Sequence, residues 1–138
     1  MIAYLDASVL LRVVLGQPGR LAEWPDIELG VGSALVQVEC LRALDRLRLR
    51  EDLPAEDLAV RREAVYRLTA EMEVVEPTWP VLRRAGQPFS TQLGTLDAVH
   101  LATALLWRDS RGEDLVLATH DRALALAARA SGLTVAGV

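Results

Sequence analysis

The chain has 138 residues, of which 51% are hydrophobic and 25% are charged, and its formal net charge at pH 7 is −4. This length predicts one domain, residues 1–138, with a sizeable core, and the acidic balance excludes a general attraction for polyanions. All fifteen basic residues are arginine, which excludes chemistry that needs a lysine. Cys40 is the one cysteine, so an intramolecular disulfide is excluded and a reducing compartment is favoured.

Strand and helix patterns alternate along the chain. The expected strands cover residues 2–5, 27–31, 74–75, 114–118 and 133–135. The expected helices cover residues 8–15, 34–50, 55–72, 78–85, 95–107 and 121–130, with Ser33 and Thr95 as N-caps. This alternation predicts right-handed βαβ units and therefore an α/β fold of three layers, in which helices cover both faces of a short, mostly parallel sheet.

The first residues and the hydropathy pattern predict a soluble, cytoplasmic protein. No basic region precedes the first apolar run, and Asp6 interrupts that run too early for a signal peptide. No apolar stretch reaches the roughly 18 residues that a membrane span needs. We therefore expect no membrane association.

Four acidic residues stand where such a sheet binds ligands, which is outside the carboxyl ends of its strands. Asp6 directly follows the first strand, and Asp121 follows the fourth. Asp97 lies in the first turn of a largely apolar helix, and Glu39 borders the apolar stripe of the second helix. Each acid also has an ordinary structural interpretation, as a helix cap, as a partner of the helix dipole or, for Glu39, in an ion pair with Arg42.

Together the four acids predict a cation site. Carboxylates that converge repel one another unless a proton or a cation lies among them, so replacing Asp6 or Asp97 by alanine should keep or raise the stability of the metal-free protein. Oxygen ligands fit Mg²⁺ or Mn²⁺. Zinc is disfavoured, because His100 and His120 are far apart in sequence and Cys40 stands alone. We expect His100 to be a structural histidine, and the three tryptophans to be packing residues.

Four short motifs occur in the order YLDASVLL, SALVQVECLRAL, GTLDAVHLATAL and LATHD. With them the whole chain resembles the PIN-domain ribonucleases, and more narrowly the VapC toxins of bacterial toxin–antitoxin pairs. The resemblance implies an acidic quartet with two auxiliary hydroxyls. These residues are Asp6, Glu39, Asp97 and Asp121, with Ser8 and Thr119.

The resemblance implies a Mg²⁺-dependent or Mn²⁺-dependent endoribonuclease that is the toxin of a type II toxin–antitoxin pair. In such chemistry the metal activates a water molecule and stabilises charge on the phosphate. Asp6 and Asp97 are the expected metal ligands, while Glu39 and Asp121 are expected to act through water. The implied partners are RNA as substrate, a small VapB-like antitoxin and a second copy of the chain.

Leftover apolar residues on the two central helices also favour a homodimer. Leu41 and Leu49 lie outside the main apolar stripe of one helix, and Leu58 and Val65 lie on the next. Such residues commonly mark a partner surface. The alternative is that the second helix covers the first.

Other functional classes remain open. They are a PIN-type nuclease that is not a toxin, a nuclease directed at DNA, and a non-catalytic RNA-binding or protein-binding module on the same fold. Receiver domains and haloacid-dehalogenase phosphatases are disfavoured because both need a lysine, and the latter also because Ser8 stands where they have a second acid.

Overall fold

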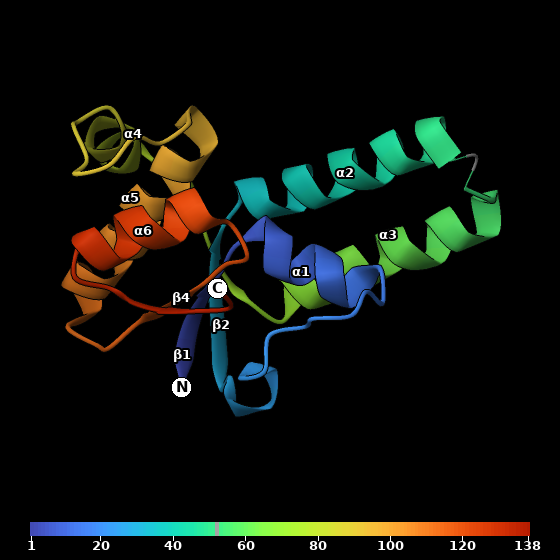
Figure 1. Cartoon of the computed structure of the whole chain (residues 1–138), viewed down its shortest axis with the longest axis horizontal. Coiled ribbons are helices and arrows are strands. Elements are labelled where there is room, and N and C mark those ends of the chain that lie inside the picture. Colours follow the sequence, from blue (N-terminus) through green and yellow to red (C-terminus); the bar gives the residue numbers. More distant parts are fainter. Residues whose placement is uncertain (52) are drawn as a thin grey trace.

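The computed structural model describes residues 1–51 and 53–138, which form a five-stranded sheet between two layers of helices (Figure 1). The strands are β1 (Ile2–Leu5), β2 (Leu29–Ser33), β3 (Glu73–Val75), β4 (Val116–Ala118) and β5 (Thr134–Ala136). The helices are α1 (Ala7–Val14), α2 (Leu35–Glu51), α3 (Ala55–Ala70), α4 (Trp79–Ala85), α5 (Thr95–Arg111) and α6 (Arg122–Ala130), with a 3₁₀ turn η1 (Trp24–Asp26). In this described part of the chain, no helix is long and apolar enough to cross a membrane.

The sheet has the strand order β3-β2-β1-β4-β5, and every pairing is parallel. The chain moves outward from β1 through β2 to β3 and then returns to the other side of β1. The backbone N–H of Asp6 donates to the carbonyl of Ala118 at 3.1 Å, so β1 and β4 stay paired up to their carboxyl ends. The expected three-layer α/β fold is therefore confirmed, and its ligand-binding edge lies where β1 and β4 end.

Side chains of β1 alternate between the two faces of the sheet. Ala3 and Leu5 join the core under α1, α2 and α3, while Tyr4 joins the core under α5 and α6. Figure 1 shows the same division, with α1, α2 and α3 to the right of the strands and α4, α5 and α6 to the left. Burial on both faces explains why β1 is apolar throughout its length.

Helices α2 and α3 lie side by side and extend away from the sheet (Figure 1). This pairing covers most of the apolar residues that the sequence assigned to a partner surface. Leu41 and Leu58 pack against the core, and Val65 is 1% exposed. The expectation was wrong for these three residues, whereas Leu49 is 67% exposed.

Three local expectations were also wrong. β2 begins at Leu29, two residues later than expected, since the backbone N–H of Ile27 closes η1 by donating to the carbonyl of Trp24 at 3.3 Å. Gly94, not Thr95, is the N-cap of α5, and no side chain caps that helix. Ser33 ends β2, and α2 begins at Leu35, one residue later than expected, with its backbone N–H donating to Oγ of Ser33 at 3.2 Å.

The three tryptophans differ in burial. Trp107 is buried and donates its indole N–H to Glu73 at 3.0 Å, and Trp24 packs against the core beneath α1. Trp79 is 62% exposed at the start of α4, so the expectation of a packing role was wrong for this residue.

Gly137 allows the C-terminal segment to pass close to the end of β4. Its φ is +97°, and a Cβ at this position would lie 2.6 Å from the carbonyl oxygen of Thr119. Gly112, at the end of α5, also has a positive φ of +65°, but a Cβ there would have no atom of the described chain within 4 Å.

We expect Gly137→Ala to lower the free energy of unfolding by about 2–3 kcal/mol, because alanine adds a clash with backbone to the strain of a positive φ. Gly112→Ala adds the strain alone and should cost about 1 kcal/mol. Urea denaturation of both variants measures the difference. Equal losses would contradict the close approach at Gly137.

Candidate functional site

The structure brings all four predicted acids to one pocket. Asp6, Glu39, Asp97 and Asp121 line a hollow of about 460 Å³ together with Ser8. They come from the end of β1, from α2, from the first turn of α5 and from the N-cap of α6. These elements meet at the carboxyl edge of the sheet, where the strand order reverses.

Asp6 is the most firmly held of the four acids. It is 6% exposed, and it is the N-cap of α1. Its Oδ2 accepts hydrogen bonds from Ser8 Oγ at 2.6 Å, from Ser8 N at 3.3 Å and from Thr119 Oγ1 at 2.9 Å. Ser8 and Thr119 thus orient the carboxylate, and within the described residues its Oδ1 accepts no hydrogen bond.

Asp121 combines a capping role with a place in the pocket. Its Oδ1 accepts from the backbone N–H of Leu124 at 2.9 Å, at the start of α6. Its own backbone N–H donates to Thr119 Oγ1 at 2.9 Å. Since the same hydroxyl donates to Asp6, Thr119 fixes the two acids relative to each other. Capping and site formation are therefore compatible interpretations of Asp121.

Glu39 ends a buried hydrogen-bond network. Its Oε2 lies 2.6 Å from His100 Nε2, and His100 Nδ1 lies 2.8 Å from the hydroxyl of Tyr4, which accepts from the backbone N–H of Ser33 at 3.2 Å. His100 and Tyr4 are fully buried. The expected ion pair of Glu39 with Arg42 does not form among the described residues, because Arg42 pairs with an aspartate three residues further along α2.

This network was not predicted in full. His100 was expected to be structural, and both of its ring nitrogens are indeed hydrogen-bonded inside the protein. Its contact with Glu39 joins residues 61 positions apart, on helices from opposite faces of the sheet. The available signal was position: His100 follows Asp97 by one helical turn, which places both on one side of α5.

His100 binds Glu39 inside the protein, with its Nε2 lying 2.6 Å from Oε2 of Glu39. Burial alone would lower the pKa of His100, but the hydrogen bond and the charge of Glu39 outweigh it and raise the pKa above its ordinary value. Burial raises the pKa of Tyr4, so its hydroxyl remains protonated and available as a hydrogen-bond donor. Glu39 is therefore held with one carboxyl oxygen bound inward.

Asp97, unlike Glu39, has a carboxyl group that no side chain of the described residues binds. Burial raises the pKa of this partly buried carboxyl, and the charges of Asp121 and Asp6 raise it further. Within the described residues, no side chain donates a hydrogen bond to it. The repulsion expected from the sequence thus falls mainly on Asp97.

The donor set fits a hydrated Mg²⁺ or Mn²⁺ ion. The pocket offers carboxylate oxygens, and Asp6, Glu39 and Asp121 each keep one oxygen outside their hydrogen bonds to the protein. Among the described residues, no three His, Cys, Asp or Glu side chains are close enough to enclose an ion by themselves. Mg²⁺ usually keeps several waters and is held by one or two carboxylates, so it needs fewer protein ligands than structural zinc does.

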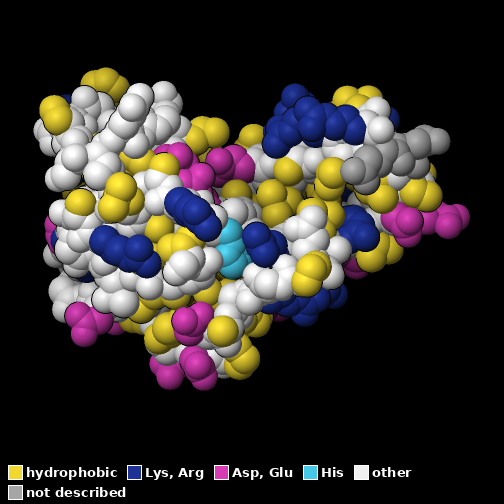
Figure 2. Space-filling view, viewed as in Figure 1, with side chains coloured by type: hydrophobic (Ala, Val, Ile, Leu, Met, Phe, Trp, Pro, Cys, Tyr) yellow, Lys and Arg dark blue, Asp and Glu magenta, His cyan; other side chains and the backbone are white. Residues whose placement is uncertain are grey.

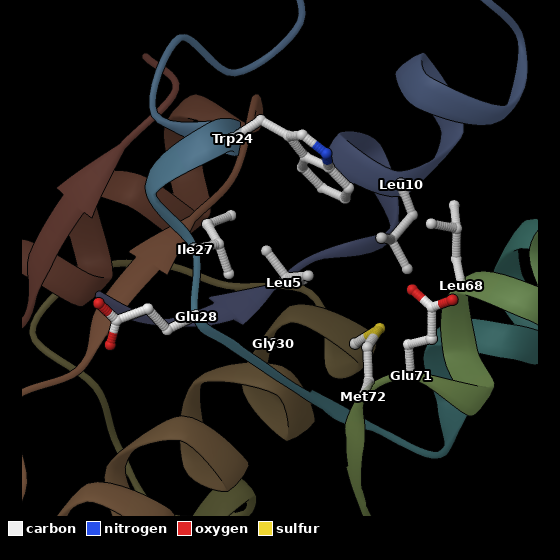
Figure 3. Close-up of a pocket in the computed structure, with 9 residues that line it drawn as sticks. All are labelled: Leu5, Leu10, Trp24, Ile27, Glu28, Gly30, Leu68, Glu71 and Met72. Atoms are coloured by element: carbon white, nitrogen blue, oxygen red, sulfur yellow. The ribbon is translucent and has the colours of Figure 1, made fainter.

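Another hollow, of about 220 Å³, lies against the opposite side of α1 and is shown in Figure 3. Leu5, Leu10 and Met72 are among its mainly apolar lining residues. Figure 3 shows Met72 turned into this space and the carboxylate of Glu28 turned away from it. It lacks the converging polar groups of the acid pocket, which remains the candidate site.

We expect Asp6→Ala and Asp97→Ala to have opposite effects on the metal-free protein. Asp6→Ala should lower the free energy of unfolding by about 1–2 kcal/mol, because it removes a cap and leaves the buried hydroxyl of Thr119 and the partly buried hydroxyl of Ser8 without their acceptor. This revises the expectation from sequence for Asp6. Asp97→Ala should raise the midpoint of thermal unfolding at pH 7.5, because it removes an ionised carboxylate that its neighbours repel.

The gain from Asp97→Ala should shrink as the pH falls. A carboxyl whose pKa is raised by folding destabilises the native state when ionised, and this effect disappears once the pH lies below its unfolded pKa. Thermal unfolding in EDTA at pH 7.5 and pH 4.5 checks both variants. A gain from Asp97→Ala that is larger at pH 4.5 would contradict the electrostatic explanation.

Comparison with known proteins agrees with this fold. The PIN domain family model matches residues 3–130, whereas no curated protein matches the sequence. The VapBC2 structure from Rickettsia felis, bound to a DNA fragment from its promoter, is 12% identical and has a TM-score of 0.66, with 98% of this chain and 97% of that chain covered. A toxin–antitoxin complex from Klebsiella pneumoniae is 16% identical with a TM-score of 0.61 and 91% of each chain covered. FitAcB from Neisseria gonorrhoeae is 19% identical with a TM-score of 0.69, covering 98% of this chain and 96% of that chain. Because the family model extends from β1 through α6, and so includes every element that supplies an acid to the pocket, this chain belongs to the PIN domain family.

Proposed function

We propose that this protein is a metal-dependent endoribonuclease and the toxin of a type II, VapBC-like toxin–antitoxin pair. The observation that carries the proposal is the single pocket lined by four acids at the carboxyl edge of a PIN-family sheet. The toxin role is supported by similar structures, one of which is described as a toxin–antitoxin complex. A cytoplasmic location belongs to the same proposal, since the RNA substrate is found there.

Mg²⁺ or Mn²⁺, when bound, supplies a water of lowered pKa and stabilises negative charge on the phosphate. Asp6 and Asp97 would hold the ion, and Glu39 and Asp121 would act through water. The oxygens available to hold the ion would be those outside the hydrogen bonds to the protein, such as Oδ1 of Asp6. A cation would also relieve the repulsion that raises the pKa of Asp97.

The chain's own side chains orient the reacting groups. Ser8 and Thr119 fix the plane of the Asp6 carboxylate through its Oδ2. His100 binds Oε2 of Glu39 and leaves Oε1 to accept a proton from the attacking water. Because His100 is fully buried, it acts on the substrate only through Glu39, as a positioning residue.

Cleavage of labelled single-stranded RNA by the purified protein tests the function. We expect cleavage with Mg²⁺ or Mn²⁺ and none with EDTA. Asp97→Asn should reduce the rate roughly 100-fold or more, because it removes a metal ligand. Asp109→Asn is the matched control, since Asp109 is an exposed aspartate on the same helix and outside the pocket.

Three outcomes of this assay contradict the proposal. Full activity of Asp97→Asn removes Asp97 from the site. Cleavage of DNA of the same sequence, but not of RNA, favours a DNA-directed nuclease. Absence of cleavage with either ion favours a binding module on the same fold.

Exposed apolar side chains at the mouth of the acid pocket support the proposal of an antitoxin partner. Val38 is 54% exposed and Leu96 is 49% exposed, and both line this pocket. Two exposed apolar side chains beside a polar site fit an apolar segment of a small protein laid across the mouth. Such a segment would also exclude RNA, which is how a VapB-like antitoxin would silence the enzyme.

The homodimer expected from the sequence is proposed on different residues. Tyr66 is 45% exposed and Val74 is 43% exposed, and they line a hollow of about 210 Å³ between α3 and β3. β3 is an edge strand of the sheet, so its outer backbone groups are open to a second copy.

We expect light scattering to give about twice the chain mass of 15.1 kDa at micromolar concentration. Val74→Arg should shift the protein to the monomer, because it places a charge in the proposed apolar contact. Leu126→Arg, at a residue 56% exposed on α6, should remain a dimer and serves as the control. A wild-type mass near that of one chain, unchanged on concentration, would refute the dimer.

A further inference from the structure

A basic pocket adjoins the acid pocket. Arg12, Arg20, His120 and Arg122 are among the residues that line a hollow of about 470 Å³. The backbone N–H of His120 donates to Oγ of Ser8, a residue of the acid pocket, at 2.9 Å. The two pockets therefore share a wall.

The same two helices supply both pockets. The first turn of α1 brings Ser8 to the acid pocket, and Arg12, one turn later, lines the basic pocket. At α6, the N-cap Asp121 lines the acid pocket and the next residue, Arg122, lines the basic one. A chain-like anionic ligand that lies across the acids at this edge of the sheet would thus continue directly onto the arginines.

The arginines of this pocket are not neutralised by the protein. Among the described residues, neither Arg12, Arg20 nor Arg122 forms an ion pair with a carboxylate. Glu23 is the acidic side chain in the pocket lining, so positive charge is in excess. In a chain of net charge −4, such a local excess is a specific feature, and it favours an anionic ligand.

Hydrogen bonds within the protein also fix residues that line the basic pocket. Arg12 donates to the carbonyls of Pro18 and Gly19 at 3.1 Å and 3.2 Å, which fixes the loop that carries Arg20. His120 Nδ1 donates to the carbonyl of Gly137 at 2.7 Å, and its Nε2 is buried without a partner in the described chain. Figure 2 shows a histidine side chain between basic side chains, with acidic side chains nearby.

We propose that this basic pocket binds backbone phosphates of single-stranded RNA next to the phosphate that is cleaved. The inference rests on the proposed ribonuclease function. Arg42 and Arg46 also line the acid pocket, but its four carboxylates outnumber them and repel a polyanion, so the excess of arginine in the basic pocket adds affinity for RNA beside it. Arg20 and Arg122 are exposed, and an arginine can bind a phosphate with two parallel hydrogen bonds. The N-terminus of α6, next to Arg122, carries partial positive charge that also attracts a phosphate.

Binding of a fluorescein-labelled 20-nucleotide RNA, measured by fluorescence anisotropy in EDTA over a range of salt concentrations, tests this site. The double variant Arg20→Ala/Arg122→Ala should bind roughly tenfold more weakly, and its slope of log Kd against log salt should fall by ~1.4, the value for two lost phosphate contacts. Arg129→Ala is the control, because Arg129 is exposed at the other end of α6 and outside the pocket. It should change neither quantity.

Cleavage kinetics with Mg²⁺ provide a second readout. The double variant should raise KM and keep kcat, since the arginines hold substrate away from the reacting atoms. A lowered kcat with unchanged KM would overturn the proposal. So would unchanged RNA affinity and salt slope, or a loss of affinity for duplex DNA alone.

The two proposals fail separately. If the wild-type protein cleaves RNA and the double variant binds RNA as the wild type does, the phosphate site is refuted and the ribonuclease function stands. If the wild-type protein cleaves no RNA but the double variant loses RNA affinity, the ribonuclease function is refuted and the phosphate site stands.

Discussion

The burial of one carboxylate, Asp6 at the end of the central strand, is the constraint on which the site depends. A carboxylate that is 6% exposed is stable only if donors replace the water that it has lost. Three donors meet its Oδ2, and they come from Ser8 in α1 and Thr119 after β4. The hydrogen bonds that offset its desolvation therefore also hold α1, β1 and β4 in a fixed arrangement, and Asp121 is attached to that arrangement through Thr119.

Glu39 is held in the same pocket by a different kind of contact. α2 extends beyond the sheet, so no strand end is available to hold the Glu39 side chain. His100 reaches it from α5 and is in turn fixed by Tyr4 of β1. The network crosses the sheet edge and ties the two helical layers to the central strand. Neutral donors bind Asp6 and a histidine binds Glu39, whereas Asp97 has neither, and its pKa is raised by burial and by the charges of Asp121 and Asp6.

The sequence was sufficient for the parts that depend on local pattern. Apolar runs placed β1, directly before Asp6, and β4, whose last residue Ala118 stands three residues before Asp121. Contacts between segments distant in the sequence could not be predicted from local pattern. The Glu39–His100 pair depends on how α2 and α5 cross the sheet edge, and the burial of Leu41 and Val65 depends on α3 lying along α2.

A short motif also cannot separate a cap from the residue next to it. Thr95 has the better capping side chain, yet Gly94 takes the N-cap, which places Asp97 in the first turn of α5 with its carboxylate in the pocket. The helix dipole favours an acid at that position, while the neighbouring carboxylates oppose its ionisation. The helix dipole alone would predict an acid that ionises easily at Asp97. Only the assembled pocket shows that burial and neighbouring carboxylates oppose its ionisation.

The distribution of charge follows from these constraints. Acids that stand at strand ends and helix starts face the edge of the sheet, where backbone N–H groups can stabilise them. Arg12 and Arg122, on the helices that begin beside Asp6 and Asp121, line the neighbouring basic pocket, and Arg42 and Arg46 of α2 line the acid pocket itself. On the proposed function, arginines placed by the same helices that place the acids would let a chain with excess acid bind RNA without any general attraction for it.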